Sequence, residues 1–267
     1  MDAQAFKTIR EIHQTDWWYR ARERFTLTTL QRLRKRCERN RQPWEILDVG
    51  CGYGSFSAAL LSFGSVLGID AEPDAVAFAR RAYPRCRFEV GTIPAELPDA
   101  SFDLITLLDV LEHLDHRVDT LQRIRERLRP KGWLLLTVPA CPSLWSRRDE
   151  ANHHRLRYRR QQLLRDLDSA QLRVVFLTFF NTLMLPPIWI AAQIERVLGI
   201  RPERIVQHRD RADQDLFVAP GLLNRLLYRI FLTESLVAGR IALPIGVSLL
   251  AVAERDDPND IMTEEQP

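Results

Sequence analysis

Apolar residues recur along the chain with two different spacings, and the change between them divides the sequence. Before residue 40 they lie three or four positions apart, as at Leu27, Leu30 and Leu33, which predicts two amphipathic helices that meet near Asp16. From Trp44 onward short apolar runs alternate with helical stretches. The runs predict strands at 45–49, 65–70, 86–90, 102–108 and 132–138, and the stretches between them predict helices at 54–63, 73–83 and 117–129.

This alternation predicts the fold class. Strands that alternate with helices form parallel sheets with crossover connections, and such sheets bind their ligands at the carboxyl ends of the strands. A helix at 160–169, a strand at 171–180 and a last strand at 246–253 complete the pattern. We therefore expect an α/β fold, with a doubly wound, Rossmann-like, mostly parallel sheet of seven strands, N-terminal helices, and a helical insertion before the last strand.

The same pattern predicts five parts along the chain. The tail contains five acids and no base, which predicts disorder. The parts are an N-terminal helical cap (1–43), a cofactor-binding core (44–180), a helical insertion (181–243), a final core strand (244–255) and a disordered acidic tail (256–267).

The segment Val174–Ile194 has no formal charge and is long enough to span a membrane. Pro186 and Pro187 interrupt it, which favours a buried strand followed by a helix. A peripheral membrane contact through 174–194 is the second interpretation, and a membrane span is the third.

Composition narrows the class of protein. With 267 residues, of which 46% are hydrophobic, the chain can bury one large core, and 38 basic against 35 acidic residues, a net charge of +3, predict no nucleic-acid partner. The four cysteines, Cys37, Cys51, Cys86 and Cys141, form no Cys-x-x-Cys pair, so neither a zinc site nor a disulfide framework is expected. A reducing compartment and an N-terminus without an apolar signal core indicate the cytoplasm, with membrane association as the alternative.

A glycine-rich turn follows the first strand, where residues 46–54 read Ile-Leu-Asp-Val-Gly-Cys-Gly-Tyr-Gly. Asp70 closes the next apolar run. Glycines let the backbone approach a ligand closely, and a carboxylate at the next strand end can accept hydrogen bonds from two ribose hydroxyls, which suits a nucleoside-type cofactor. An ordinary tight turn is the plain alternative. A dinucleotide site fits less well, because Ser55 stands at the third glycine position of its G-x-G-x-x-G motif.

The chain resembles the class I S-adenosylmethionine-dependent methyltransferases over about residues 40–180. Four blocks carry the resemblance in the expected order: Leu47-Asp48-Val49-Gly50-Cys51-Gly52-Tyr53-Gly54; Gly68-Ile69-Asp70; Phe102-Asp103-Leu104-Ile105 running into Asp109-Val110-Leu111-Glu112-His113; and Leu128-Arg129-Pro130-Lys131-Gly132-Trp133. The resemblance implies S-adenosyl-L-methionine as the cofactor, and a methyl transfer as the reaction.

By this resemblance, three sets of residues would bind the three parts of the cofactor. The methionine part would lie on Asp48, Gly50, Cys51, Gly52 and Gly54, the ribose on Asp70, and the adenine beside Ala71. Many relatives carry an acid for the adenine amine after the third strand, where this chain has Gly91-Thr92-Ile93, so Thr92 or a backbone carbonyl would replace it. Asp109 lies where the family's wall meets the methyl group, or else it caps the helix that follows.

Methyl transfer from a sulfonium mainly needs alignment and the removal of a proton, and it demands no metal. The candidate bases are His113, His153 and His154. A structural histidine is an equally good interpretation of His113, and a solvated loop pair is the preferred interpretation of His153 and His154. The expected acceptor is a small molecule or a lipid-linked molecule, methylated at oxygen in preference to nitrogen or carbon. A non-catalytic cofactor-binding or scaffold protein is the alternative from another class.

Two further groups of side chains have a functional reading and a plain one. Trp17, Trp18 and Tyr19 would shield the sulfonium or a flat substrate, or else pack in the core, and packing is the preferred interpretation. The arginines near the histidines would bind an anionic acceptor or form a solvated face, and the solvated face is preferred: Arg147, Arg148, Arg155, Arg157, Arg159 and Arg160.

Overall fold

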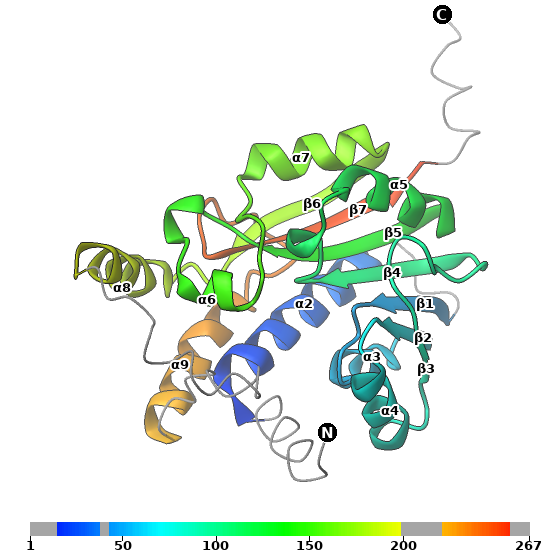
Figure 1. The fold of residues 1–267 in the computed structure, drawn as a ribbon, viewed down its shortest axis with the longest axis horizontal. Helices are drawn as coiled ribbons and strands as arrows, with labels where there is room; N and C mark the ends of the chain where they lie inside the picture. The colour runs from blue at the N-terminus through cyan, green and yellow to red at the C-terminus, as the bar shows by residue number, and fades with distance from the viewer. Residues whose placement is uncertain (1–14, 38–42, 199–220, 257–267) are drawn as a thin grey trace, which may run out of the picture.

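The computed structural model describes residues 15–37, 43–198 and 221–256, and in them the chain forms a seven-stranded sheet in the order β3-β2-β1-β4-β5-β7-β6 (Figure 1). The strands β1 to β5 run parallel, and β7 lies antiparallel between β5 and β6. The strands are β1 (Trp44–Val49), β2 (Gly64–Asp70), β3 (Arg87–Val90), β4 (Phe102–Leu108), β5 (Leu128–Pro139), β6 (Leu172–Phe180) and β7 (Ser248–Arg255). The α/β fold class is confirmed.

Eight described α-helices and two short 3-10 helices connect these strands. The helices are α2 (Trp17–Arg36), α3 (Ser55–Leu60), α4 (Pro73–Ala82), α5 (Arg117–Arg127), α6 (Arg147–Ala151), α7 (Arg160–Ser169), α8 (Leu185–Leu198) and α9 (Gly221–Glu234), with η1 (Leu111–His113) and η2 (Pro142–Leu144). The first predicted helix, the charged middle of the insertion and the acidic tail from residue 257 lie outside the described residues.

Most predicted boundaries agree with the structure to within a few residues, and the largest difference is at the start of β5. We expect a helix to Arg129 and a strand from Gly132, but α5 ends at Arg127 and β5 begins at Leu128. Leu128 pairs with Phe102 of β4, and the register shifts before Trp133 pairs with Leu104. The turn residues Pro130 to Gly132 therefore form an irregularity within one long strand.

Two hydrophobic cores cover the two faces of the sheet. One contains Leu121 of α5 and Leu163 of α7, and the other contains Leu30 of α2, Leu60 of α3 and Phe231 of α9. Figure 1 shows α5 and α7 on one side of the sheet and α2 and α9 on the other. The α2 and α9 layer thus holds the N-terminal cap and part of the insertion against the same face.

Helix α2 begins where the sequence predicts a break. The Asp16 carboxylate accepts a hydrogen bond from the Trp18 backbone N–H at 2.8 Å and caps the helix. The Trp18 ring stacks on Phe180 at 6.3 Å and lies 5.7 Å from Phe231, and Phe25 stacks on Phe180 at 5.3 Å. The preferred interpretation of the tryptophans, packing in the core, is confirmed.

The uncharged segment from Val174 forms the predicted strand and helix. Its first part is the end of β6, and Pro186 and Pro187 lie in the first turn of α8, where a missing backbone N–H leaves no hydrogen bond unmade. Among the described residues, none of the helices is both long and apolar enough to cross a membrane.

Candidate cofactor and acceptor site

The glycine-rich turn lies at the carboxyl end of β1, at the centre of the parallel part of the sheet. Gly50, Gly52 and Gly54 have φ angles of +70°, +51° and +81°, in the left-handed region that other residues rarely adopt. A Cβ on Gly50 would lie 2.4 Å from the Val110 side chain, and one on Gly54 would lie 2.8 Å from Phe88. These two glycines let the turn pack against neighbouring elements.

Gly52 differs, because a Cβ built on it meets no heavy atom within 4 Å. Its backbone N–H donates to Asp70 Oδ2 at 2.8 Å, and the Glu72 backbone N–H donates to Asp70 Oδ1 at 2.9 Å. The carboxylate therefore joins the turn after β1 to the turn after β2. The open space beside Gly52 is the place where a ligand could approach the backbone, and Asp70, which is only half-buried, keeps further lone pairs for it.

Asp48 lies beneath this turn and is 3% exposed. It accepts hydrogen bonds from Ser57 Oγ at 2.5 Å and from Thr106 Oγ1 at 2.6 Å. Burial raises the pKa of Asp48 to about 6, while the two hydroxyl donors oppose that rise. Its carboxylate thus ties β1 to α3 and β4, so that Asp48 supports the turn from below.

The predicted adenine side lies at the ends of β2 and β3. Ala71 and Thr92 are exposed there, and the buried Gly91 donates its N–H to the Asp70 carbonyl at 3.0 Å. The Thr92 hydroxyl and N–H both donate to Glu96, at 2.9 and 2.7 Å. Glu96 therefore engages the Thr92 side chain and brings an acid to the ends of β2 and β3, a contact that no local sequence pattern predicts.

Asp109 follows β4 with a φ of +53°. Its carboxylate accepts from Thr137 Oγ1 at 2.8 Å and forms an ion pair with Arg22 of α2. The N-cap of η1 is Val110, with no side-chain capping bond. The alternative that Asp109 caps the following helix is therefore wrong, and its carboxylate joins the N-terminal helix to the crevice wall.

Two of the three predicted histidines lie together beyond Asp109. The His113 and His154 rings are 4.9 Å apart and nearly perpendicular, and burial, followed by the neighbouring His154, lowers the pKa of His113. His154 Nδ1 lies 2.9 Å from Asp149 Oδ1, and its Nε2 lies 3.9 Å from Glu112 Oε1. His153 is exposed with a φ of +57° and stands at the edge of this group.

Two of the nearby arginines make hydrogen bonds and ion pairs with other residues of the same chain. Arg155 donates to the His113 carbonyl at 2.8 Å and pairs with Asp115 at 2.7 Å. Arg157 pairs with Asp149 at 2.9 Å. These two side chains shape the loop, so they are poor candidates for an anion site, whereas Arg159 and Arg160 are exposed.

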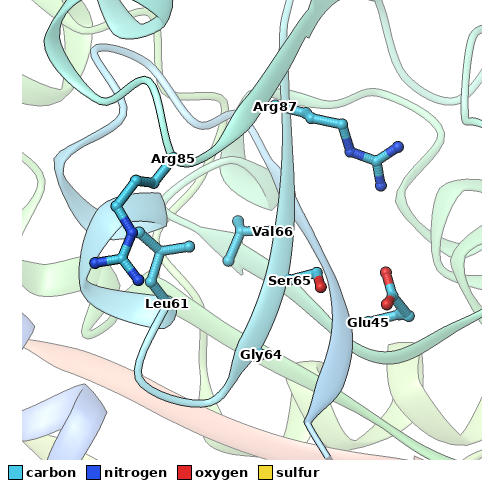
Figure 2. A pocket seen from close by; sticks show the side chains of 7 residues that line it. All are labelled: Glu45, Leu61, Gly64, Ser65, Val66, Arg85 and Arg87. Carbon is cyan, nitrogen blue, oxygen red and sulfur yellow. The ribbon is translucent and has the colours of Figure 1, made fainter.

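A hollow of about 490 Å³ lies at the amino ends of the strands, away from the glycine-rich turn (Figure 2). Glu45, Gly64 and Arg87, which line it with Arg85, stand at or near the amino ends of β1, β2 and β3. Ligands of doubly wound sheets bind instead at the carboxyl ends of the strands. The glycine turn, Asp70, His113 and His154 all follow the carboxyl ends of strands. The candidate site therefore lies at those ends.

Sequence reasoning missed Glu112, Arg22 and Asp149. Glu112 stands inside the quoted Asp109-Val110-Leu111-Glu112-His113 block, and an acid within an apolar stretch is a signal that could have been used. Arg22 adjoins the aromatic residues of the cap, but its ion pair with Asp109 spans 87 positions and has no local signature.

Comparison with known proteins agrees with this geometry. Residues 47–136 match the family described as methyltransferase domain. A probable S-adenosylmethionine-dependent methyltransferase of Mycolicibacterium smegmatis is 32% identical over 136 residues, which are 50% of this chain and 49% of that protein. A mitochondrial ubiquinone biosynthesis O-methyltransferase of Schizosaccharomyces pombe is 32% identical over 102 residues, 35% of this chain and 37% of that protein. The chain thus spans about half or less of the curated relatives it matches.

Among solved structures, an S-adenosylmethionine-dependent methyltransferase from Mesorhizobium loti shares the fold with a TM-score of 0.52 and 18% identity. The similarity covers 84% of this chain and 98% of that one. The matched residues contain the glycine turn, Asp70 and the wall from Asp109 to His113. Residues 47–136 therefore match the methyltransferase domain family, and 84% of the chain shares its fold with an S-adenosylmethionine-dependent methyltransferase.

Proposed function

We propose that this protein transfers the methyl group of S-adenosylmethionine to an oxygen atom of a small or lipid-linked acceptor. The observation that carries the proposal is the link between Gly52 and Asp70, which places a carboxylate beside open space at the backbone of the turn. When bound, the cofactor supplies a methyl group that is already activated by the sulfonium.

The residues of the turn would hold the cofactor. Asp70 would accept hydrogen bonds from the ribose hydroxyls, Gly50 to Gly54 would lie along the methionine part, and Asp48 would keep the turn in place from below. The adenine would lie near Ala71 and Thr92, where Glu96 offers the acid that Thr92 lacks. Rigid support of this kind matters because methyl transfer depends on alignment.

The acceptor would enter between the N-terminal helix and the wall after β4. Arg22, Asp109 and His113 come from those elements, and the contact of Val110 with Gly50 places the wall against the turn. Oxygen as the receiving atom is supported by the name of the yeast relative, an O-methyltransferase.

A lipid-linked acceptor, with a peripheral membrane contact through 174–194, is supported by apolar side chains that the structure leaves in solvent. Trp189, Ile190 and Ile194 of α8 are 47 to 52% exposed, and Leu222 and Leu226 of α9 are 83% and 54% exposed. Arg225 and Arg229 of α9 are exposed too. Helices that lie on membrane surfaces commonly carry exposed basic residues, which attract anionic headgroups.

Vesicle binding tests this part of the proposal. The protein should sediment with anionic phospholipid vesicles and much less with neutral ones, and Trp189→Ser should reduce the bound fraction. Leu223→Ser replaces an exposed apolar residue of α9 and shows whether the loss of vesicle binding extends from α8 to α9. Equal recovery in the supernatant with both kinds of vesicle would contradict a membrane contact.

Calorimetry tests the core of the proposal. Titration with S-adenosylmethionine and S-adenosylhomocysteine should each give one site per chain. Incubation with donor labelled in the methyl group, and with fractionated water-soluble and lipid extracts, should then transfer the label to one fraction. Binding of both ligands without transfer to any fraction would favour the other candidate, a non-catalytic cofactor-binding protein.

A further inference from the structure

The most unusual group in the described part of the chain is the side chain of Glu112. It is 0% exposed, and neither of its carboxylate oxygens has a hydrogen-bond partner among the described residues. A buried carboxylate without partners is costly, so native structures rarely keep one unless it binds a cation or accepts a proton. Glu112 follows β4 in η1, three residues after the crevice residue Asp109.

His154 points a ring nitrogen at this carboxylate. Its Nδ1 bonds Asp149 Oδ1 at 2.9 Å, and Asp149 is held in turn by Arg157 and by the Ser146 backbone N–H, both at 2.9 Å. A carboxylate on one ring nitrogen fixes the tautomer and leaves the lone pair of the other nitrogen free, as in many metal-binding histidines. Here that other nitrogen, Nε2, lies 3.9 Å from Glu112 Oε1, too far for a hydrogen bond.

His113 completes the group. One ligand atom each from Glu112, His113 and His154 all lie within 4.8 Å of one another. Two ligands at about 2.0–2.2 Å from one tetrahedral ion are about 3.4 Å apart, so small side-chain rotations would bring the three onto one ion. The carboxylate and the histidine nitrogen already face each other across a gap that such an ion would fill.

We infer that Glu112, His113 and His154 form a binding site for a divalent transition-metal ion, with Asp149 as the residue that positions His154. Two imidazoles and one carboxylate favour ions such as Zn²⁺, Mn²⁺ or Fe²⁺ over Mg²⁺, which prefers oxygen ligands. Three protein ligands leave at least one coordination position open. This differs from the sequence-based expectation that the reaction demands no metal.

The site gives the two histidines a different task from the one the sequence suggests. A histidine nitrogen bound to a metal has no lone pair left to accept a proton, so His113 and His154 would act as ligands. Because Asp109 and Glu112 belong to the same short wall, an ion here would lie on the acceptor side of the proposed crevice. The open position could then receive an oxygen of the acceptor.

Titration of the metal-depleted full-length protein with ZnCl₂ tests the inference without the methyl donor. We expect one Zn²⁺ per chain, a rise in melting temperature of several degrees at a hundredfold excess over Kd, and at least tenfold weaker binding in Glu112→Gln and His154→Gln. His116→Gln is the matched control, since His116 is exposed just beyond the cluster, and it should bind like the wild type. Replacing Zn²⁺ by Co²⁺ should give visible absorption with nitrogen ligation in the wild type.

Each outcome of the titration either supports or overturns the proposed metal site. Absence of heat and of a thermal shift in the wild type would overturn the site, and so would equal affinity of wild type, Glu112→Gln and His154→Gln. If either variant fails to fold, the Co²⁺ spectrum of the wild type still decides, because a purely aqua-like spectrum excludes histidine ligation. Failure of this titration leaves binding of S-adenosylmethionine untouched, so the two proposals can fail separately.

Discussion

Replacing Gly52 with Ala should weaken cofactor binding at least tenfold while the protein stays folded. The added Cβ would meet no heavy atom within 4 Å, so the folded protein has room for it, and it would project into the open space beside Asp70. The φ of +51° does carry a cost, about 1–2 kcal/mol for a residue with a Cβ. A chain of this size loses about 2–4 °C of melting temperature per kcal/mol, so we expect a fall of about 2–8 °C.

The substitution should also weaken binding of the ligand. A methyl group between the turn and a bound nucleoside prevents the close approach that the glycine allows, and a loss of about 1.4 kcal/mol corresponds to a tenfold weaker Kd. Calorimetry with S-adenosylhomocysteine at a temperature where both proteins are folded should therefore show binding at least tenfold weaker in Gly52→Ala.

Gly239→Ala is the matched control for backbone strain. Gly239 has a φ of +67°, and its added Cβ would lie 3.0 Å from the Thr29 carbonyl oxygen on the α2 side of the fold. We expect a comparable or greater loss of melting temperature with unchanged affinity. If Gly52→Ala binds S-adenosylhomocysteine as tightly as the wild type, the ligand does not lie against this turn and the reasoning is refuted.

Three more outcomes are expected. Asp70→Ala should weaken binding of S-adenosylhomocysteine by about 1.5–3 kcal/mol, the range for hydrogen bonds to charged groups, and unchanged calorimetric affinity would rule out its ribose role. A double-mutant cycle of Arg22→Met and Asp109→Asn in urea unfolding should give a favourable coupling of about 0.5–3 kcal/mol, and additive effects would disprove the ion pair. Burial raises the pKa of Glu112 from 4.5 to about 8, so its contribution to the free energy of unfolding is present below pH 4.5 and is lost as the pH rises through 8. With chelator present, the wild type should therefore lose stability relative to Glu112→Gln between pH 5 and 8, and parallel curves would contradict the shift.

Local patterns predicted the elements well because β1, β2 and β4 are short, largely apolar runs between turn signals. The end of β2 at Asp70 and the turn after β1 could be placed for the same reason, since glycine spacing and the next strand end lie within one β-α-β unit. The start of β5 could not, because Leu128 joins the strand by pairing with Phe102, far away in sequence, despite the Pro and Gly residues that follow it.

The acceptor side shows the limit more clearly. His113 and His154 were identified by residue type, but their common partner Glu112 becomes evident only from burial, which depends on the packing of the whole wall. Likewise Asp109 has the residue type of a helix cap, while its actual partners, Arg22 and Thr137, come from elements 87 and 28 positions away. Local residue patterns carry little information about such distant pairs.

The place of β7 in the sheet has a consequence for how the chain folds during synthesis. Because β7 fills the gap between β5 and β6, neither of those strands has its neighbour on that side until residues 248–255 have left the ribosome. Until then β5 and β6 expose unpaired backbone edges that invite pairing with other chains. A nascent or shortened chain that stops before Ser248 should therefore aggregate or depend on chaperones, even though the entire glycine turn is already made.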